Sequence, residues 1–370
     1  IDTSGSMDEP NKLPLLKRAF GLLVDTLKPT DTVSIVVYAG SAGVVLKPTK
    51  AGERTAILSA LDHLEAGGST AGAEGIELAY RLAAESKIAD GVNRVILATD
   101  GDFNVGIDTP DALKTFIKSK RDEGIFLSVL GFGRGNLDDA LMQALAQNGN
   151  GNASYIDSFK EAQKVLVTEG GANMVTIAKD VKIQVEFNPA QVSEYRLIGY
   201  ETRALNREDF NNDAVDAGEI GAGHSVTAIY EITPAGSGGE LNDPLRYGSS
   251  ASPTATSDEL GFLKLRYKAP DGDTSKLIET PITQSLAVES IAAAGADQRF
   301  AAAVAAFGQK LKGSAYGETL SWDAIASLAN GAKGSDEDGY RAEFVQMVHL
   351  AAALAPDRAD AAPSPPSSVE

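Results

Sequence analysis

The stretch RVILATDGD, residues 94–102, decides how the first part of the chain folds. Its first five residues, RVILA, are Arg94 followed by a short apolar run with β-branched side chains, a pattern typical of a buried strand. Amphipathic helices are predicted on either side of it, at 71–86 and 110–122, because apolar residues recur there every three or four positions. A buried strand between two such helices predicts a parallel sheet that is covered by helices on both faces.

The same alternation continues over residues 1–170. Further strands are predicted at 32–39, 44–46, 125–130 and 153–156, and further helices at 12–27, 54–64, 137–147 and 159–169. We therefore expect a doubly wound, Rossmann-like α/β domain with a mostly parallel sheet. The chain opens with Ile1 and runs directly into DTSGS, which we expect to end a truncated first strand. Any export signal or anchor upstream would lie outside this sequence.

After residue 170 the pattern changes. Alternation with period two predicts an antiparallel β unit within 176–286, with strands at 181–187, 226–232, 262–267 and 277–283. Helical patterns then follow within 288–355, at 290–311, 319–330 and 338–355. We expect these elements to form a second module, 171–357. The Pro- and Ser-rich residues 358–370 predict a disordered tail.

Composition excludes several classes of function. The chain has 370 residues, 43% of them hydrophobic and 23% charged, which is typical of a globular protein. Its formal net charge of −18 disfavours binding to nucleic acid or to anionic membrane surfaces. It has no cysteine, so disulfides, thiolate nucleophiles and iron–sulfur clusters are excluded. No uninterrupted apolar stretch is long enough to cross a bilayer, so no transmembrane segment is predicted within this chain.

Oxygen-bearing side chains gather in three connections of the α/β unit. They are Asp2, Ser4 and Ser6 in the first loop, Thr70 in the second and Asp100 in the third. In an open parallel sheet, ligands bind outside the carboxyl ends of the strands, and Asp100 directly follows a predicted strand. This set offers hydroxyls and carboxylates only, which suits a hard cation such as Mg²⁺. With the two carboxylates in an outer shell, the cation would stay electrophilic and could accept an Asp or Glu from another protein.

The segments DTSGSM (2–7), GGST (67–70) and ATDGD (98–102) resemble the metal-ion-dependent adhesion site of von Willebrand factor type A domains. The resemblance covers about residues 1–170 and implies a doubly wound domain that binds Mg²⁺ or Mn²⁺ and mediates protein–protein recognition. It also implies that Asp2, Ser4, Ser6, Thr70 and Asp100 form the metal site. The implied partner is a protein that offers an acidic side chain, and no catalytic residues are implied.

The second module resembles the C-terminal module of bacterial von Willebrand factor type A proteins of the YfbK type. The resemblance rests on YRLIGYETR (195–203), REDFNND (207–213) and DAGEIGAGHSVTAIYEI (216–232). It implies no activity for this module. It does imply that the full protein is exported to the bacterial cell envelope.

Other interpretations of the three loops remain open. Ser4, Ser6 and Thr70 could cap helices, with Asp100 a turn residue. Asp102 could be an extra ligand or a loop support. A Mg²⁺-dependent hydrolase or phosphoryl-transfer enzyme is a rival, but no Lys or Arg accompanies any of the three loops in the sequence to stabilise a phosphate. A structural envelope module with a vacant site is a third possibility. We expect a binding protein and not an enzyme.

Overall fold

The computed structural model describes residues 1–89, 91–101, 110–133, 137–170, 176–199, 204–215, 217–242, 258–270, 272–313 and 320–355. Asp102 and the predicted tail therefore lie outside the described residues. The chain divides into two compact units. The first consists of 1–182, 208–225 and 266–277, and the second of 183–207, 226–265 and 278–370. Each is described by itself below.

The first 170 residues alternate helices and strands, as the sequence predicts. The strands are β1 (Thr32–Tyr38), β2 (Ala42–Lys50), β3 (Arg94–Thr99), β4 (Phe126–Phe132) and β5 (Ala153–Ile156). The helices are α1 (Leu13–Thr26), α2 (Arg54–Asp62), α3 (Gly72–Glu85), α4 (Pro110–Asp122), α5 (Asp139–Asn148) and α6 (Phe159–Gln163). A π-helical turn at Lys164–Thr168 extends α6. The predicted α/β domain is confirmed.

Residues 1–3 occupy the centre of the sheet. β3, β4 and β5 pair in parallel, and β1 pairs with β2 in antiparallel. Between the two groups, Asp2 donates its backbone N–H to the carbonyl of Ala98 in β3, and Tyr38 of β1 donates to the carbonyl of Ile1. Asp2 and Tyr38 form a parallel bridge. This short segment therefore pairs with strands on both of its sides.

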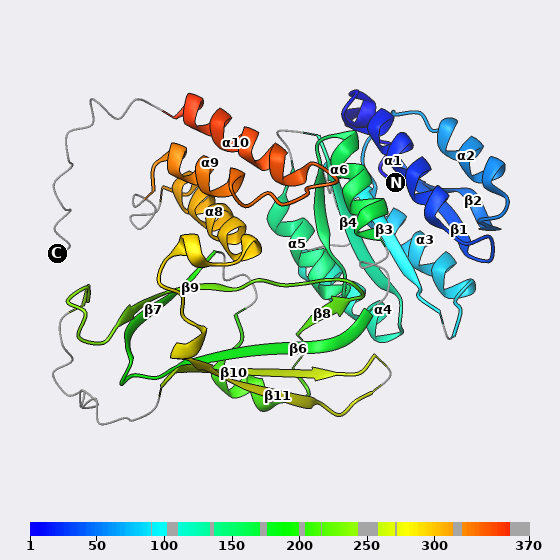
Figure 1. Ribbon diagram of the computed structural model, residues 1–370. Coiled ribbons are helices and arrows are strands. Elements are labelled where there is room, and N and C mark those ends of the chain that lie inside the picture. The colour runs from blue at the N-terminus through cyan, green and yellow to red at the C-terminus, as the bar shows by residue number, and fades with distance from the viewer. Residues whose placement is uncertain are drawn as a thin grey trace, which may run out of the picture. The chain divides into compact units, whose positions relative to one another are not determined.

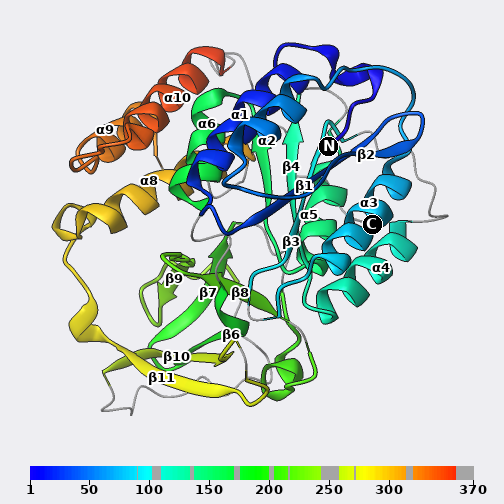
Figure 2. The same cartoon turned by 90° about the vertical axis from the view of Figure 1, so that its right-hand side faces the viewer.

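Two apolar cores lie on opposite faces of this sheet, so the domain is doubly wound. One core unites α1, α2 and α6 with Ala98, Leu130 and Ile156 of the strands. The other unites α3, α4 and α5 with Leu97, Leu127 and Val129. Neighbouring strand residues point to opposite faces, which explains why Leu97 and Ala98 belong to different cores. Figure 2 shows the two groups of helices on either side of the strands.

The later part contains antiparallel strands, as predicted. β11 (Lys276–Thr283), β10 (Glu259–Lys268), β6 (Thr176–Phe187) and β8 (Gly218–Gly221) form one sheet in that order. β7 (Val192–Ile198) and β9 (Ile229–Pro234) pair separately in antiparallel. Helices α8 (Ala296–Leu311), α9 (Trp322–Asn330) and α10 (Tyr340–Leu354) follow and share one apolar core. Figure 1 shows these three helices side by side.

The element boundaries differ from the predictions in places. β2 covers Ala42–Lys50 and is far longer than the predicted 44–46. Many of its residues are exposed and are held in a strand by pairing with β1. Hydropathy does not reveal such pairing. β7 was not predicted, because its sequence VSEYRLI mixes charged and apolar residues. The predicted helix 290–311 begins only at Ala296, after a short 3₁₀ turn at Ile291–Ala293.

Candidate functional site

Asp2 is fully buried at the carboxyl end of the central segment. Its Oδ1 accepts a hydrogen bond from the backbone N–H of Ser4 at 2.9 Å, and its Oδ2 accepts one from Thr99 Oγ1 at 3.1 Å. The first bond closes a tight turn directly after the strand segment, a role that Asp commonly plays. Asp2 therefore connects the first loop to the end of β3.

Ser4 and Ser6 lie together in the first loop. A 3₁₀ turn at Gly5–Asp8 brings their hydroxyl oxygens to 3.0 Å from each other. Ser4 is 2% exposed, whereas Ser6 is half-buried. The two hydroxyls thus form a pair of neighbouring oxygen atoms that could both bind a cation.

Asp100 directly follows β3 and is fully buried. Its Oδ2 lies 3.1 Å from the ammonium nitrogen of Lys12. At the next position, Gly101 has a φ of 97° and donates its N–H to Thr99 Oγ1 at 3.1 Å. Glycine suits this left-handed conformation because it has no Cβ. Since Thr99 also donates to Asp2, its hydroxyl joins the first and third loops.

The second predicted loop lies directly beside the first. Gly5 donates its N–H to the carbonyl of Gly68 at 3.0 Å, and Gly67 donates to the carbonyl of Thr3 at 2.8 Å. Gly68 has a φ of 83° and packs closely on Gly40, where an added Cβ would lie 3.2 Å from the backbone nitrogen. Thr70 lies two residues beyond Gly68, within roughly 7.6 Å along the chain, and is half-buried. The structure thus brings the segments that carry all five predicted site residues to one edge of the sheet.

Two buried carboxylates in one place raise the electrostatic energy of the site. Burial raises the pKa of Asp2 above its ordinary value, and the nearby charge of Asp100 raises it further, while hydrogen bonds from Ser4 and Thr99 act in the opposite direction. Burial also raises the pKa of the Tyr38 phenol well above its ordinary value, as does the charge of Asp2. A cation at this position would relieve the repulsion between Asp2 and Asp100.

Lys12 is a residue of this site that sequence reasoning missed. The sequence indicated that no Lys or Arg lies beside the three loops. This prediction is wrong, because the Lys12 ammonium contacts Asp100 and the carbonyl of Ser6 in the folded structure. A signal was present in the sequence. Lys12 lies four residues before Leu16, which is fully buried, so helical periodicity places the lysine on the buried face.

The donor set fits a hard divalent cation. It consists of three hydroxyls and two carboxylates, and it lacks imidazole and thiolate groups. Within the part of the chain that the structure describes, no group of three His, Cys, Asp or Glu side chains is placed to hold a metal ion. The candidate set contains only two such residues and takes its other donors from Ser and Thr.

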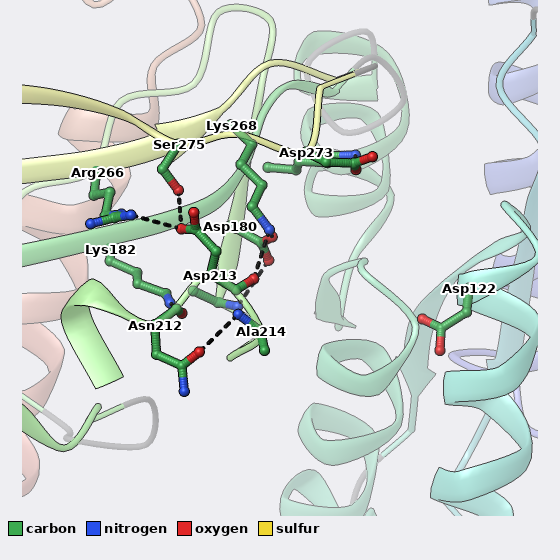
Figure 3. Close-up of polar contacts among 12 residues, drawn as sticks. Asp122, Asp180, Lys182, Asn212, Asp213, Ala214, Arg266, Lys268, Asp273 and Ser275 are labelled. Carbon is green, nitrogen blue, oxygen red and sulfur yellow. Dashed lines mark hydrogen bonds and ion pairs between the residues drawn. The ribbon is translucent and has the colours of Figure 1, made fainter. Parts of the chain in front are cut away.

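A second polar cluster lies in the first unit, around residues 208–213 of the segment REDFNND (207–213). Figure 3 shows how lysines of two strands hold it. Lys182 of β6 donates to the carbonyls of Asp209 and Asn212. Lys268 of β10 donates to the carbonyl of Asp213 at 2.9 Å and to Asp180 Oδ2 at 2.6 Å. These bonds satisfy backbone carbonyls at the end of a 3₁₀ turn, so the cluster has a structural explanation.

No helix among the residues described here combines the length and the apolar character that a membrane span needs.

Comparison with known families identifies both parts of the chain. The model described as "von Willebrand factor type A domain" matches residues 1–168, and the model described as "Uncharacterized protein YfbK, C-terminal" matches residues 172–354. The "Uncharacterized protein YfbK" of Escherichia coli (strain K12) is 48% identical over 354 residues, which are 95% of this chain and 60% of that protein. The chain thus spans 60% of the length of this relative.

Solved structures also match the chain, two of them with the following coverage and TM-scores. The "von Willebrand factor type A" structure from Catenulispora acidiphila is 19% identical, with a TM-score of 0.49, and the match covers 94% of this chain and 80% of that chain. An "aerotolerance-related membrane protein" from Bacteroides fragilis NCTC 9343 is 26% identical, with a TM-score of 0.38, and the match covers 45% of this chain and 94% of that chain.

Proposed function

This chain is a von Willebrand factor type A protein with a YfbK-type C-terminal domain, and from that premise we propose that it binds a partner protein through a divalent cation. The von Willebrand factor type A family often mediates metal-dependent protein interactions. The proposed cation is Mg²⁺ or Mn²⁺, and the proposed partner offers the carboxylate of an Asp or Glu. The proposed ligands are Asp2, Ser4, Ser6, Thr70 and Asp100.

One observation carries this proposal. Asp2 and Asp100 are both fully buried at the same edge of the sheet, and Thr99 connects their loops. Burying two carboxylates together is costly unless cationic groups offset their charge. One lysine contacts Asp100 and offsets one of the two negative charges, so the pair of carboxylates still attracts a divalent cation. The nearby pair of Ser4 and Ser6 hydroxyls supports the same assignment.

Each residue would have a distinct role. The hydroxyls of Ser4, Ser6 and Thr70 are neutral donors that would contact the cation. The carboxylates of Asp2 and Asp100 would hold it by charge, directly or through water. The bound cation would supply a positive centre that attracts an incoming carboxylate. Ser6 and Thr70 are half-buried and not fully covered, so a partner can approach the site from their side.

We infer a binding role and no catalytic one. A rival Mg²⁺-dependent hydrolase or phosphoryl-transfer enzyme would use Asp2 and Asp100 around the same cation. Turnover of a phosphate ester with Mg²⁺, and its loss on Asp100→Asn, would favour the rival.

We further propose an association with the bacterial cell envelope, which fractionation of cells and detection of the full protein can test.

Calorimetric titration with Mg²⁺ and Mn²⁺ tests the proposal. We expect the wild-type chain to bind one ion, and Asp2→Ala or Thr70→Ala to weaken that binding by about tenfold or more, since each removes an oxygen that holds the cation directly or through water. Ser69→Ala is a matched control, because Ser69 lies in the same loop and is not a proposed ligand. Capture of the partner should also require the cation. Equal capture with Mg²⁺ and with a chelator would exclude the proposal.

A further inference from the structure

Lys12 is a buried cation in the candidate site. It is 3% exposed, and a lysine is rarely buried to this extent unless its charge is paired. Its ammonium donates to Asp100 Oδ2 at 3.1 Å and to the Ser6 carbonyl at 3.0 Å. It also lies 3.6 Å from Glu9 Oε1, but that carboxylate is largely exposed and solvent screens it. Lys12 therefore connects the first and third loops, which the proposed cation would also bridge.

The backbone after β4 is shaped to let the lysine reach this position. Gly133 has a φ of 83°, and a Cβ built on it would lie 2.3 Å from Lys12 Cε. Any side chain at Gly133 would therefore displace the lysine. The aliphatic part of Lys12 packs against this glycine while its charged end reaches the carboxylates. Such close fitting fixes the distance between the ammonium and the site.

A fixed ammonium changes the charge of the site in a predictable way. Asp2 and Asp100 together carry a charge of −2, and Lys12 brings the total to −1. A divalent cation then leaves the buried groups with one net positive charge. Without Lys12 the same groups would sum to zero. The lysine should therefore repel the cation and, once the cation is bound, increase the attraction for an incoming carboxylate.

We propose that Lys12 is a positioning and specificity residue that weakens cation binding in exchange for stronger capture of an acidic partner. This inference rests on the proposed function, because it presumes a cation at the same site. A structural role alone makes a different prediction. If Lys12 served only to hold the loops together, removing it would weaken binding of the cation and of the carboxylate alike.

The test compares the wild type with Lys12→Gln, Lys12→Met and Lys12→Arg. Calorimetry measures Mg²⁺ and Mn²⁺ affinity. Relaxation of acetate methyl protons by bound Mn²⁺ measures carboxylate binding to the loaded protein. We expect the two neutral variants to bind Mg²⁺ about tenfold more tightly and acetate at least about threefold more weakly. Lys12→Arg keeps the charge and should resemble the wild type. Lys17→Met is the matched control, since Lys17 lies in α1, which Lys12 directly precedes, and its ammonium donates to the carbonyl of Asp62 instead.

The outcomes separate this inference from the proposed function. Absence of Mg²⁺ and Mn²⁺ binding by the wild type would overturn the proposed function, and this inference with it. Binding by the wild type with equal or weaker cation binding by both neutral variants would overturn only the role of Lys12. If both neutral variants fail to fold while Lys12→Arg folds, the charge is a requirement of the fold, and the inference is likewise overturned.

Discussion

The buried charge of Asp2 suits the proposed cation site but lowers the stability of the fold when no cation is bound. It accepts hydrogen bonds from Ser4 and Thr99, and both stabilise its charged form. Its burial and the charge of Asp100 act in the opposite direction and prevail, because its pKa is raised above the ordinary value. A raised carboxyl pKa means that the stability associated with Asp2 is lost as the pH rises through that pKa.

Asp2→Asn should therefore stabilise the metal-free protein at neutral pH. The amide keeps the size of the side chain and removes one buried charge. We expect a gain in the free energy of unfolding, because the variant no longer buries a charged group beside Asp100. The gain should shrink as the pH falls and should vanish well below the ordinary carboxyl value of 3.8, where the wild-type side chain is protonated in both states.

Thermal unfolding with a chelator present, at several pH values, measures this effect. A variant that is less stable than the wild type at every pH would show that the hydrogen bonds of Asp2 outweigh its charge. Asp139→Asn serves as a control for general charge effects, because Asp139 is exposed at the start of α5.

Sequence reasoning at the residue scale works for side chains that follow a strand and fails for side chains that reach across space. Asp2 and Asp100 were predicted to lie together because both end strands of one sheet. Lys12 contacts Asp100 across 88 positions of sequence. Helical periodicity places Lys12 on a buried face, but it does not identify Asp100 as its partner. The placement of Thr70 depends on backbone bonds between loops, which only the folded structure reveals.

At the scale of elements, one glycine sets how closely α3 packs on β1. A Cβ built on Gly75 would lie 2.5 Å from Tyr38 Cδ1 and 2.8 Å from two further atoms of that side chain. Tyr38 is 1% exposed, so it has little room to move. Gly75→Ala should therefore destabilise the protein by about 1–3 kcal/mol, the usual cost of overpacking. Chemical denaturation measures this change.

Gly21→Ala is the matched control for that prediction. Gly21 lies inside α1, and the nearest atom to its added Cβ is Leu58 Cδ2 at 3.9 Å, an ordinary contact. Alanine is favoured over glycine in a helix by up to about 1 kcal/mol, so this variant should be more stable than the wild type. If both variants gain stability, the close packing of α3 on β1 is not as tight as the structure indicates.

The carboxylate of Asp336 stabilises the start of α10. Asp336 accepts hydrogen bonds from the backbone N–H groups of Arg341 at 2.9 Å and Ala342 at 2.8 Å, and these bonds lower its pKa below the ordinary value. The stability that it contributes is therefore present above the ordinary value of 3.8 and lost as the pH falls through the lower folded value. Asp336→Asn should lower the melting temperature at neutral pH, and the difference should disappear in strong acid. Asp338→Asn, which changes an exposed neighbour, should leave the melting temperature unchanged.

The bounds of buried helices and strands were predicted from the sequence more accurately than those of exposed ones. The buried strands β3 and β4 and the amphipathic helices α1 and α3 were predicted within a few residues of their bounds. β2 and β7 are largely defined by pairing partners instead of by burial, and hydropathy alone describes them poorly. The π-helical turn at Lys164–Thr168 carries the same apolar pattern as an α-helix, so its different hydrogen bonding was not foreseen.

At the scale of the whole molecule, the strong negative charge complicates any test of cation binding. With a formal net charge of −18, the chain should attract cations everywhere on its surface, and added salt should reduce its self-repulsion. A stabilising effect of Mg²⁺ is therefore not specific by itself. Specificity requires that the effect saturates and depends on the proposed ligands.

A comparison of the two units tests whether Mg²⁺ acts at the proposed site. All proposed ligands lie in the first unit, whereas the core of α8, α9 and α10 lies in the second. A ligand that binds only the folded state at a hundred times its dissociation constant stabilises by about 2.7 kcal/mol. In scanning calorimetry, Mg²⁺ should therefore raise the melting temperature of the first unit beyond the shift caused by NaCl at equal ionic strength. Asp100→Asn should retain only the shift caused by salt. An equal excess shift in both units, or in the variant, would mean that Mg²⁺ acts on the surface charge and not at the site.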